Sequence, residues 1–201
     1  MCKIGFVDDD REMFDDYKKR LSRRNVDLVF AGNCRDENDI INWILSNEIH
    51  CVLVDHKLTS QYTFLGTDLV ARINEVLPHL PCIILTNYPE DSEGENVVVK
   101  NLILDRNKLD ATDLSEFVSI LRQSVEVFKN RKLRDSSKYL QLLQKKKTEQ
   151  LSATEEEQFL LLYKQLRAYG EVDDIPITLL KPDIDKKLDD LLLKLDAVIE
   201  K

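Results

Sequence analysis

The first 128 residues alternate short, largely apolar runs with segments in which apolar residues recur at helical spacing. The apolar runs, which predict five strands, lie at 4–7, 26–31, 51–54, 82–85 and 102–104. The runs at 51–54 and 82–85 are apolar at every position, which is typical of strands covered on both faces of a sheet. Strands separated by helices pair in parallel, so the pattern predicts a five-stranded, doubly wound parallel α/β sheet.

The segments between these strands predict helices, and one of them is weak. Helical spacing of apolar residues is found at 13–21, 40–45, 69–77 and 114–125. Asp10 is the predicted N-cap of the first helix, because its carboxylate can accept hydrogen bonds from amides of the first turn. Segment 87–100 contains Pro89, Gly94 and three consecutive valines, so a short or remodelled helix is expected there.

Residues 129–201 are predicted to form a helical extension of a domain that spans residues 1–128. One helix is expected through the basic stretch 129–150, and a second begins with the capping box of Ser152 and Glu155. After Pro182, apolar residues step by four and three in a seam of two heptads, formed by Ile184, Leu188, Leu191, Leu195 and Val198. This seam predicts either packing within the chain or a homodimer contact.

The charge distribution argues against DNA as a partner. The 201 residues carry a formal net charge of −8, and residues 1–128 contain 14 basic and 23 acidic residues. Residues 129–150 are the exception, with eight basic and two acidic residues. The lysine run at 145–147 within this stretch is typical of a solvated helix end. No helix-turn-helix pattern accompanies this stretch, so DNA binding is not expected.

The sequence also bears on the compartment. No apolar run approaches the roughly 20 residues that a membrane-spanning helix needs, so no membrane partner is expected. No signal peptide is visible at the start of the sequence, which makes the cytoplasm the expected location. The four cysteines lack metal-ligand or redox spacing. Cys51 and Cys82 lie in apolar runs and are expected to be small buried side chains.

Polar residues stand at the ends of the predicted strands. Asp8, Asp9 and Asp10 follow the first strand, Asp55 ends the third, Thr86 ends the fourth, and Lys108 lies just past the fifth. In an open parallel sheet, ligands bind beyond the carboxyl ends of the strands. These side chains are therefore expected to converge on one edge of the sheet.

Such a cluster of carboxylates requires either that some of them are protonated or that a cation lies among them. Two carboxylates about 4 Å apart repel each other by about 4 kcal/mol at an effective dielectric constant of 20. Oxygen ligands with high negative charge suit Mg²⁺. One carboxylate could then attack a phosphorus atom and form an acyl phosphate, while a hydroxyl and an ammonium contact the oxygens of the transferred group. Thr86 and Lys108 could supply these two groups.

The ordered set of these motifs resembles the receiver domain of two-component response regulators. The matching residues are the segments 7–10, 52–55 and 83–86 together with Lys108. Asp9 and Asp55 are 46 residues apart, Asp55 and Thr86 are 31 apart, and Thr86 and Lys108 are 22 apart, as in receivers. The resemblance covers roughly residues 1–128 and implies the flavodoxin-like (CheY-like) order of strands.

The resemblance also implies roles for individual residues. Asp55 would be the phosphoacceptor, taking a phosphoryl group from a histidine kinase or a histidine phosphotransfer protein. Asp8, Asp9, Asp55 and the backbone carbonyl of Lys57 would bind Mg²⁺. Thr86 would contact the phosphoryl group, and Lys108 would pair with it. Such a receiver catalyses at most its own phosphorylation and dephosphorylation, without turnover of a small molecule.

This chain departs from the family pattern near the fifth strand. Lys108 is followed by Leu109 in place of the usual proline, which leaves Arg106 as a rival for the phosphate-pairing cation. Asp105 stands at a position that is often aromatic in receivers, and Asn87 where a very small residue is usual. The expected switch between the threonine and an aromatic residue is therefore altered in this chain.

The output cannot be assigned from a motif, because the helical extension carries none for DNA binding or catalysis. We therefore expect a protein effector, or a role as a phosphate sink that draws phosphoryl groups away from a competing regulator. The alternative is a pseudo-receiver adaptor that binds partners through the extension without phosphotransfer. In that case the triplet 8–10 would serve to cap a helix, and Asp55 would be an ordinary loop residue. Thr86 would be a strand terminus and Lys108 a solvated lysine.

Overall fold

The structure is a computed structural model that describes residues 2–58, 62–94, 98–111 and 113–176. It divides into two compact units, residues 1–134 and residues 135–201. The division falls inside the 34-residue helix α6 (Ser115–Thr148), which belongs in part to each unit. The predicted domain boundary between residues 128 and 129 lies in the same helix.

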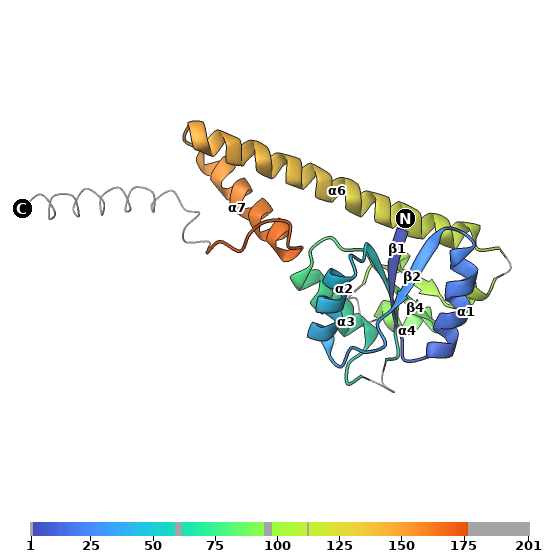
Figure 1. The fold of residues 1–201 in the computed structure, drawn as a ribbon. Coiled ribbons are helices and arrows are strands. Elements are labelled where there is room, and N and C mark those ends of the chain that lie inside the picture. Colours follow the sequence, from blue (N-terminus) through green and yellow to red (C-terminus); the bar gives the residue numbers. More distant parts are fainter. Residues whose placement is uncertain (1, 59–61, 95–97, 112, 177–201) are drawn as a thin grey trace, which may run out of the picture. The chain divides into compact units, whose positions relative to one another are not determined.

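The first unit contains one parallel sheet, and its five strands confirm the predicted fold class (Figure 1). Their order across the sheet is β2-β1-β3-β4-β5. The strands are β1 (Cys2–Val7), β2 (Val26–Phe30), β3 (Cys51–Asp55), β4 (Cys82–Thr86) and β5 (Ile103–Asp105). The chain moves outward from β1 to β2 and then returns to β3, so the strand order reverses between β1 and β3. The crevice beyond their carboxyl ends is where ligands bind in such sheets.

Helices cover both faces of the sheet (Figure 1). On one face, α1 (Arg11–Ser22) and the first part of α6 share a core cluster with the sheet. On the other face, α2 (Glu37–Ser46) contacts α3 (Gly66–Val76). Segment 87–100 was predicted to form a short or remodelled helix. Its described residues form the six-residue helix α4 (Pro89–Gly94) and the start of the 3-10 helix η1 (Lys100–Leu102), as expected. The four-residue helix α5 (Asn107–Asp110) follows β5.

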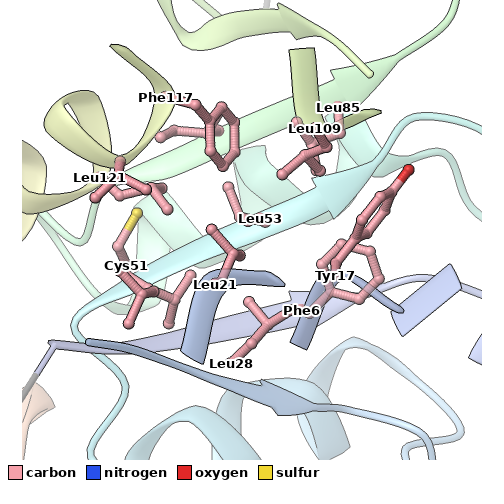
Figure 2. Packing of buried hydrophobic residues seen from close by; sticks show 14 of the residues in the cluster. Phe6, Tyr17, Leu21, Leu28, Cys51, Leu53, Leu85, Leu109, Phe117 and Leu121 are labelled. Carbon is pink, nitrogen blue, oxygen red and sulfur yellow. The ribbon is translucent and has the colours of Figure 1, made fainter. Parts of the chain in front are cut away.

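Buried side chains between the sheet and α1 hold the central strands in place (Figure 2). Phe6, Leu53 and Leu85 come from three neighbouring strands and pack in one cluster with Tyr17 of α1 and Phe117 of α6. Removing a large apolar side chain of this kind from water stabilises a fold by about 1.5–3 kcal/mol. The carboxyl ends of β1, β3 and β4 are therefore anchored by a common core.

Helix α3 begins at Gly66, and no residue with a larger side chain fits at this position. Its amide donates a hydrogen bond to the carbonyl of His56, with a length of 2.9 Å. A β-carbon at Gly66 would overlap the backbone carbonyl oxygen of Asp55. The start of α3 thus lies directly against the end of β3 and supports the backbone of Asp55.

The second unit contains a helical hairpin formed by the end of α6 and α7 (Ala153–Ala168). The ring of Tyr139 stacks on Phe159 with the centroids 5.1 Å apart. The predicted capping box is present: the Ser152 hydroxyl accepts from the amide of Glu155, and the Glu155 carboxylate accepts from the amide of Ser152. The predicted seam from Ile184 to Val198 lies outside the described residues.

No helix in the described part of the chain is both long enough and apolar enough to cross a membrane.

The close packing at Gly66 predicts that Gly66→Ala destabilises the protein by about 1–3 kcal/mol, the usual cost of an overpacked site. The midpoint of urea unfolding measures the loss. Gly94→Ala is the matched control, because Gly94 ends α4 and a β-carbon there meets no atom within 4 Å. This control should leave the midpoint unchanged or raise it slightly, since alanine is the better helix former. Equal effects of the two variants would contradict the close approach of Gly66 to Asp55.

Candidate functional site

Three carboxylates meet at the carboxyl edge of the sheet, where the sequence predicted them. Asp8 and Asp9 follow β1, and Asp55 is the last residue of β3, the strand beside it. One oxygen from each of the three side chains lies within 4.8 Å of the others. The pairing of β1 with β3 brings these residues together although they are far apart in sequence.

Asp8, Asp55 and Asp10 have different surroundings. Asp8 is 2% exposed and Asp55 is 8% exposed. One carboxylate oxygen of Asp8 accepts from the amide of Asp10 at 2.9 Å. Asp10 itself caps α1, as predicted, because its carboxylate accepts hydrogen bonds from the amides of Glu12 and Met13. The capping residue of the acidic triplet is therefore separate from the carboxylates that form the cluster.

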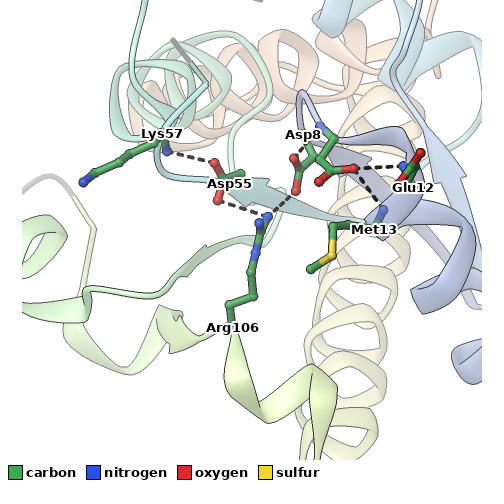
Figure 3. A network of polar contacts seen from close by, with 7 residues as sticks. Asp8, Glu12, Met13, Asp55, Lys57 and Arg106 are labelled. Carbon is green, nitrogen blue, oxygen red and sulfur yellow. Dashed lines mark hydrogen bonds and ion pairs between the residues drawn. The ribbon is translucent and has the colours of Figure 1, made fainter. Parts of the chain in front are cut away.

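Arg106 neutralises the two buried carboxylates. Its guanidinium forms an ion pair with Oδ2 of Asp8 and a second one with Oδ1 of Asp55, the latter at 3.1 Å (Figure 3). The amide of Arg106 donates to the carbonyl of Thr86 at 2.9 Å, which ties the end of β5 to β4. The cation that the carboxylates require is therefore supplied by a side chain that directly follows β5.

The structure does not bring Lys108, the other candidate cation, to the carboxylates. Lys108 lies within α5, and its ammonium pairs with Glu116 at 3.6 Å. The sequence left both Lys108 and Arg106 as candidates for the phosphate-pairing cation. The choice between them depends on the residue at which the fifth strand ends. Because β5 ends at Asp105, the next side chain stands at the sheet edge, whereas Lys108 is already part of a helix.

Burial changes the acidity of both carboxyl groups. It raises the pKa of Asp8 to about 6, although Arg106 and a backbone hydrogen bond act in the opposite direction. Burial also raises the pKa of Asp55, again against the effect of Arg106. Both shifts follow from the loss of water around a charged group, which favours its neutral form. Both carboxyl groups therefore hold a proton more readily than an exposed aspartate does.

Two further predicted residues flank Asp55. Thr86 ends β4, is buried, and accepts at Oγ1 a 3.1 Å hydrogen bond from the amide of Tyr88. The amide of Lys57 donates to Oδ2 of Asp55 at 3.0 Å. The backbone at Lys57 therefore turns beside the carboxylate, while the role of its carbonyl as a metal ligand stays a prediction.

The donor set at this edge fits a magnesium ion. Mg²⁺ holds oxygen ligands at 2.0–2.1 Å, so two of its ligands lie at most about 4.2 Å apart. The carboxylate oxygens of Asp8, Asp9 and Asp55 lie within 4.8 Å of one another, so small rotations would bring them into this range. All three are hard oxygen donors, which Mg²⁺ prefers over nitrogen and sulfur.

Removing the cation from this cluster should destabilise the protein in a pH-dependent way. At pH 8 we expect Arg106→Gln to lower the free energy of unfolding by about 3 kcal/mol, because it leaves two buried carboxylates unneutralised. At pH 5 the loss should be smaller. Burial holds the native pKa of Asp8 above its unfolded value, so the native state binds protons there that replace the lost cation.

Urea unfolding at the two pH values measures both losses. Arg72→Gln is the matched control, because Arg72 and Glu75 form an exposed ion pair on α3. Its effect should stay below about 1 kcal/mol at either pH. A loss for Arg106→Gln that is the same at pH 5 and pH 8 would contradict the described cluster.

Solved structures share the fold of the first unit. A response regulator receiver domain from Clostridium thermocellum superposes with a TM-score of 0.50 at 18% sequence identity, covering 64% of this chain and 98% of that chain. The signal receiver domain of an HD domain-containing protein from Pseudomonas fluorescens Pf-5 has a TM-score of 0.51 at 23% identity, with coverage of 64% and 98%. NtrX from Brucella abortus has a TM-score of 0.51 at 17% identity, covering 70% of this chain and 30% of that chain.

Neither a family model nor a curated protein matches the sequence. The likeness therefore rests on the structure: the parallel sheet, the strand order and the coverage of almost the whole length of the isolated receiver domains. The first unit of this chain has the fold of a response regulator receiver domain.

Proposed function

We propose that this chain is a phosphoacceptor receiver protein of a two-component phosphorelay. It takes a phosphoryl group onto Asp55 from the phosphohistidine of a histidine kinase or a histidine phosphotransfer protein, and it requires Mg²⁺. The observation that carries this proposal is the gathering of Asp8, Asp9 and Asp55 beside the guanidinium of Arg106 at the carboxyl edge of a receiver fold. A histidine kinase as the donor is consistent with the cytoplasm as the location of the reaction.

In the proposed reaction, a carboxylate oxygen of Asp55 attacks the phosphorus atom of phosphohistidine. A P–O bond forms, the P–N bond breaks, and the imidazole leaves with its bonding electron pair and takes up a proton. The product is an acyl phosphate on Asp55. Because burial raises the pKa of Asp55, its ionised oxygen is a stronger base and a better nucleophile than an exposed carboxylate.

Asp8, Asp9 and Asp55 would hold the Mg²⁺ ion, and the backbone carbonyl of Lys57 is the proposed further ligand. When bound, the ion neutralises negative charge on the oxygens of the transferred phosphoryl group. The buried position of Asp8 makes it the strongest anchor, since a carboxylate removed from water gains most from a cation beside it.

Arg106 is the proposed partner of the phosphoryl group, in preference to Lys108. Its guanidinium already contacts an oxygen of Asp55, and a planar guanidinium can bind two phosphoryl oxygens at once. The ammonium of Lys108 is engaged by Glu116. Thr86 would supply a hydroxyl to a third phosphoryl oxygen, because its side chain ends the neighbouring strand β4.

The proposed output is a protein contact or a phosphate sink. The helical hairpin of the second unit exposes apolar side chains, among them Leu140 and Leu161, which are 59% and 56% exposed. A protein partner for this hairpin is proposed because the helical extension carries no DNA-binding motif. The excess of acidic residues in residues 1–128 also argues against DNA.

Phosphorylation should be visible in the intact mass of the protein. With Mg²⁺ and a small phosphodonor such as acetyl phosphate, we expect one adduct with the mass of a phosphoryl group. Asp55→Asn should abolish the adduct because the amide is no nucleophile, and removal of Mg²⁺ by a chelator should suppress it. Asp16→Asn is the matched control, since Asp16 lies exposed on α1 beside Lys19, and this variant should retain the adduct.

An adduct that persists in Asp55→Asn would overturn the assignment of the phosphoacceptor. No adduct from acetyl phosphate, or from a panel of phosphorylated histidine kinases, would leave the pseudo-receiver adaptor as the function of this fold.

The two candidate cations can be separated by the rate at which the adduct forms. Arg106→Gln should slow it by about tenfold or more, because a charge-assisted hydrogen bond to the transferred group is lost. Arg106→Lys should recover part of the rate, since it restores the charge without the planar guanidinium. Lys108→Gln should stay close to the unchanged protein. The opposite order of the two glutamine variants would assign the role to Lys108.

A further inference from the structure

Arg20 links helix α1 to the segment that follows β5. It lies in the last turn of α1, and its guanidinium donates hydrogen bonds to the backbone carbonyls of Leu109 and Ala111. The guanidinium also faces the carboxylate of Asp110, with Nη1 3.8 Å from Oδ1. The two carbonyls belong to residues that lie 89 and 91 positions further along the chain. One side chain of α1 therefore holds three consecutive residues of a distant loop.

These contacts hold the carboxyl end of α5. The last four carbonyls of an α-helix have no partner inside the helix. Because α5 has only four residues, it depends on partners from outside to satisfy its carbonyls. The guanidinium of an arginine carries five N–H donors in a planar fork, so it can serve two carbonyls at once. Arg20 thus stabilises the end of a helix that is too short to be stable by itself.

The other end of this short helix is Arg106. Arg106 directly precedes α5, and its carbonyl accepts a 2.9 Å hydrogen bond from the amide of Leu109. Its own amide donates to the carbonyl of Thr86, the last residue of β4. The backbone of Arg106 is therefore fixed on one side by β4. On the other side it is fixed by Leu109, whose carbonyl accepts from Arg20.

Tyr17, one turn earlier on α1, makes no comparable contact. Its ring is buried, and its hydroxyl has no hydrogen-bond partner among the residues that the structure describes. Burial raises the pKa of Tyr17 to about 12, so at neutral pH the side chain cannot pair with Arg106 as an anion. Of these two side chains of α1, Arg20 is the one that bonds to the segment after β5.

We propose that Arg20 is a positioning residue for Arg106. By holding the end of α5, it fixes the turn from which the guanidinium of Arg106 reaches Asp8 and Asp55. A displacement of about 1 Å in a reacting group can cost about a hundredfold in rate, so the position of this turn matters for the site. The consequence for phosphoryl transfer rests on the proposed function, whereas the consequence for the ion cluster can be measured without it.

A double-mutant cycle in urea unfolding tests the positioning without a phosphodonor. It compares the unchanged chain with Arg20→Gln, Arg106→Gln and the double variant. If Arg20 acts through Arg106, Arg20→Gln should lower the free energy of unfolding by less in the Arg106→Gln background, because no guanidinium is left to be placed. A contact that only stabilised the loop would cost the same in both backgrounds. An equal or larger loss in the Arg106→Gln background would overturn the proposal.

Two further variants serve as controls for this cycle. Arg20→Lys should lose less than Arg20→Gln, since an ammonium can still donate to a carbonyl. Lys19→Gln is the matched control, because Lys19 is the neighbouring cation of α1 and forms an exposed ion pair with Asp16. Its effect should be the same with Arg106 present or replaced.

The rate at which the phosphoryl adduct forms from acetyl phosphate is the second measurement. Arg20→Gln should slow it by about tenfold, Arg20→Lys should recover part of the rate, and Lys19→Gln should leave it unchanged. In the Arg106→Gln background, Arg20→Gln should slow the reaction no further. An unchanged rate in Arg20→Gln would overturn the role of Arg20 in phosphoryl transfer. If the unchanged chain forms no adduct, the proposed function fails, and the unfolding cycle still decides the positioning of Arg106.

Discussion

The ion cluster of Asp8, Asp55 and Arg106 is the interaction on which the rest of the site depends. Two carboxylates that are nearly removed from water repel each other, and their pKa values rise because burial penalises the charged form. The guanidinium of Arg106 opposes both effects. A site built in this way is stable only with a cation present, which makes it suited to exchange one positive partner for another. The same property supports the proposed binding of Mg²⁺ by the carboxylates, and the guanidinium of Arg106 supports the proposed contact with a phosphoryl group.

The scaffold behind the cluster explains why the carboxylates stay close enough to repel. Parallel pairing of β1 with β3 sets the residues at the carboxyl ends of the two strands side by side. The common core under these strands leaves little freedom to separate, and Gly66 allows α3 to begin directly against the carbonyl of Asp55. The fold therefore holds an electrostatically unfavourable arrangement by means of apolar packing, as functional sites commonly do.

Much of the site could be predicted because its residues stand at the ends of recognisable strands. The apolar runs before Asp8, Asp55 and Thr86 mark where three strands end, and the edge rule for parallel sheets places their side chains together. The choice between Lys108 and Arg106 could not be made in this way. The residue whose side chain lies at the sheet edge depends on where the fifth strand ends. The short apolar run at 102–104 does not define that last residue, which is Asp105 in the structure. The contact of Arg20 with the end of α5 was also missed, since no local pattern connects residues that are so far apart in the sequence.

The sequence by itself determined the five strands, their parallel pairing, the weak fourth helix and the acidic edge, because these follow from local periodicity and from residue types at strand ends. Only the tertiary structure decided which cation neutralises the carboxylates. It also showed that the helix after the sheet continues from Ser115 to Thr148 across the division between the two units. These features depend on distances between side chains that are remote in sequence, and such distances are set by the packing of the whole domain.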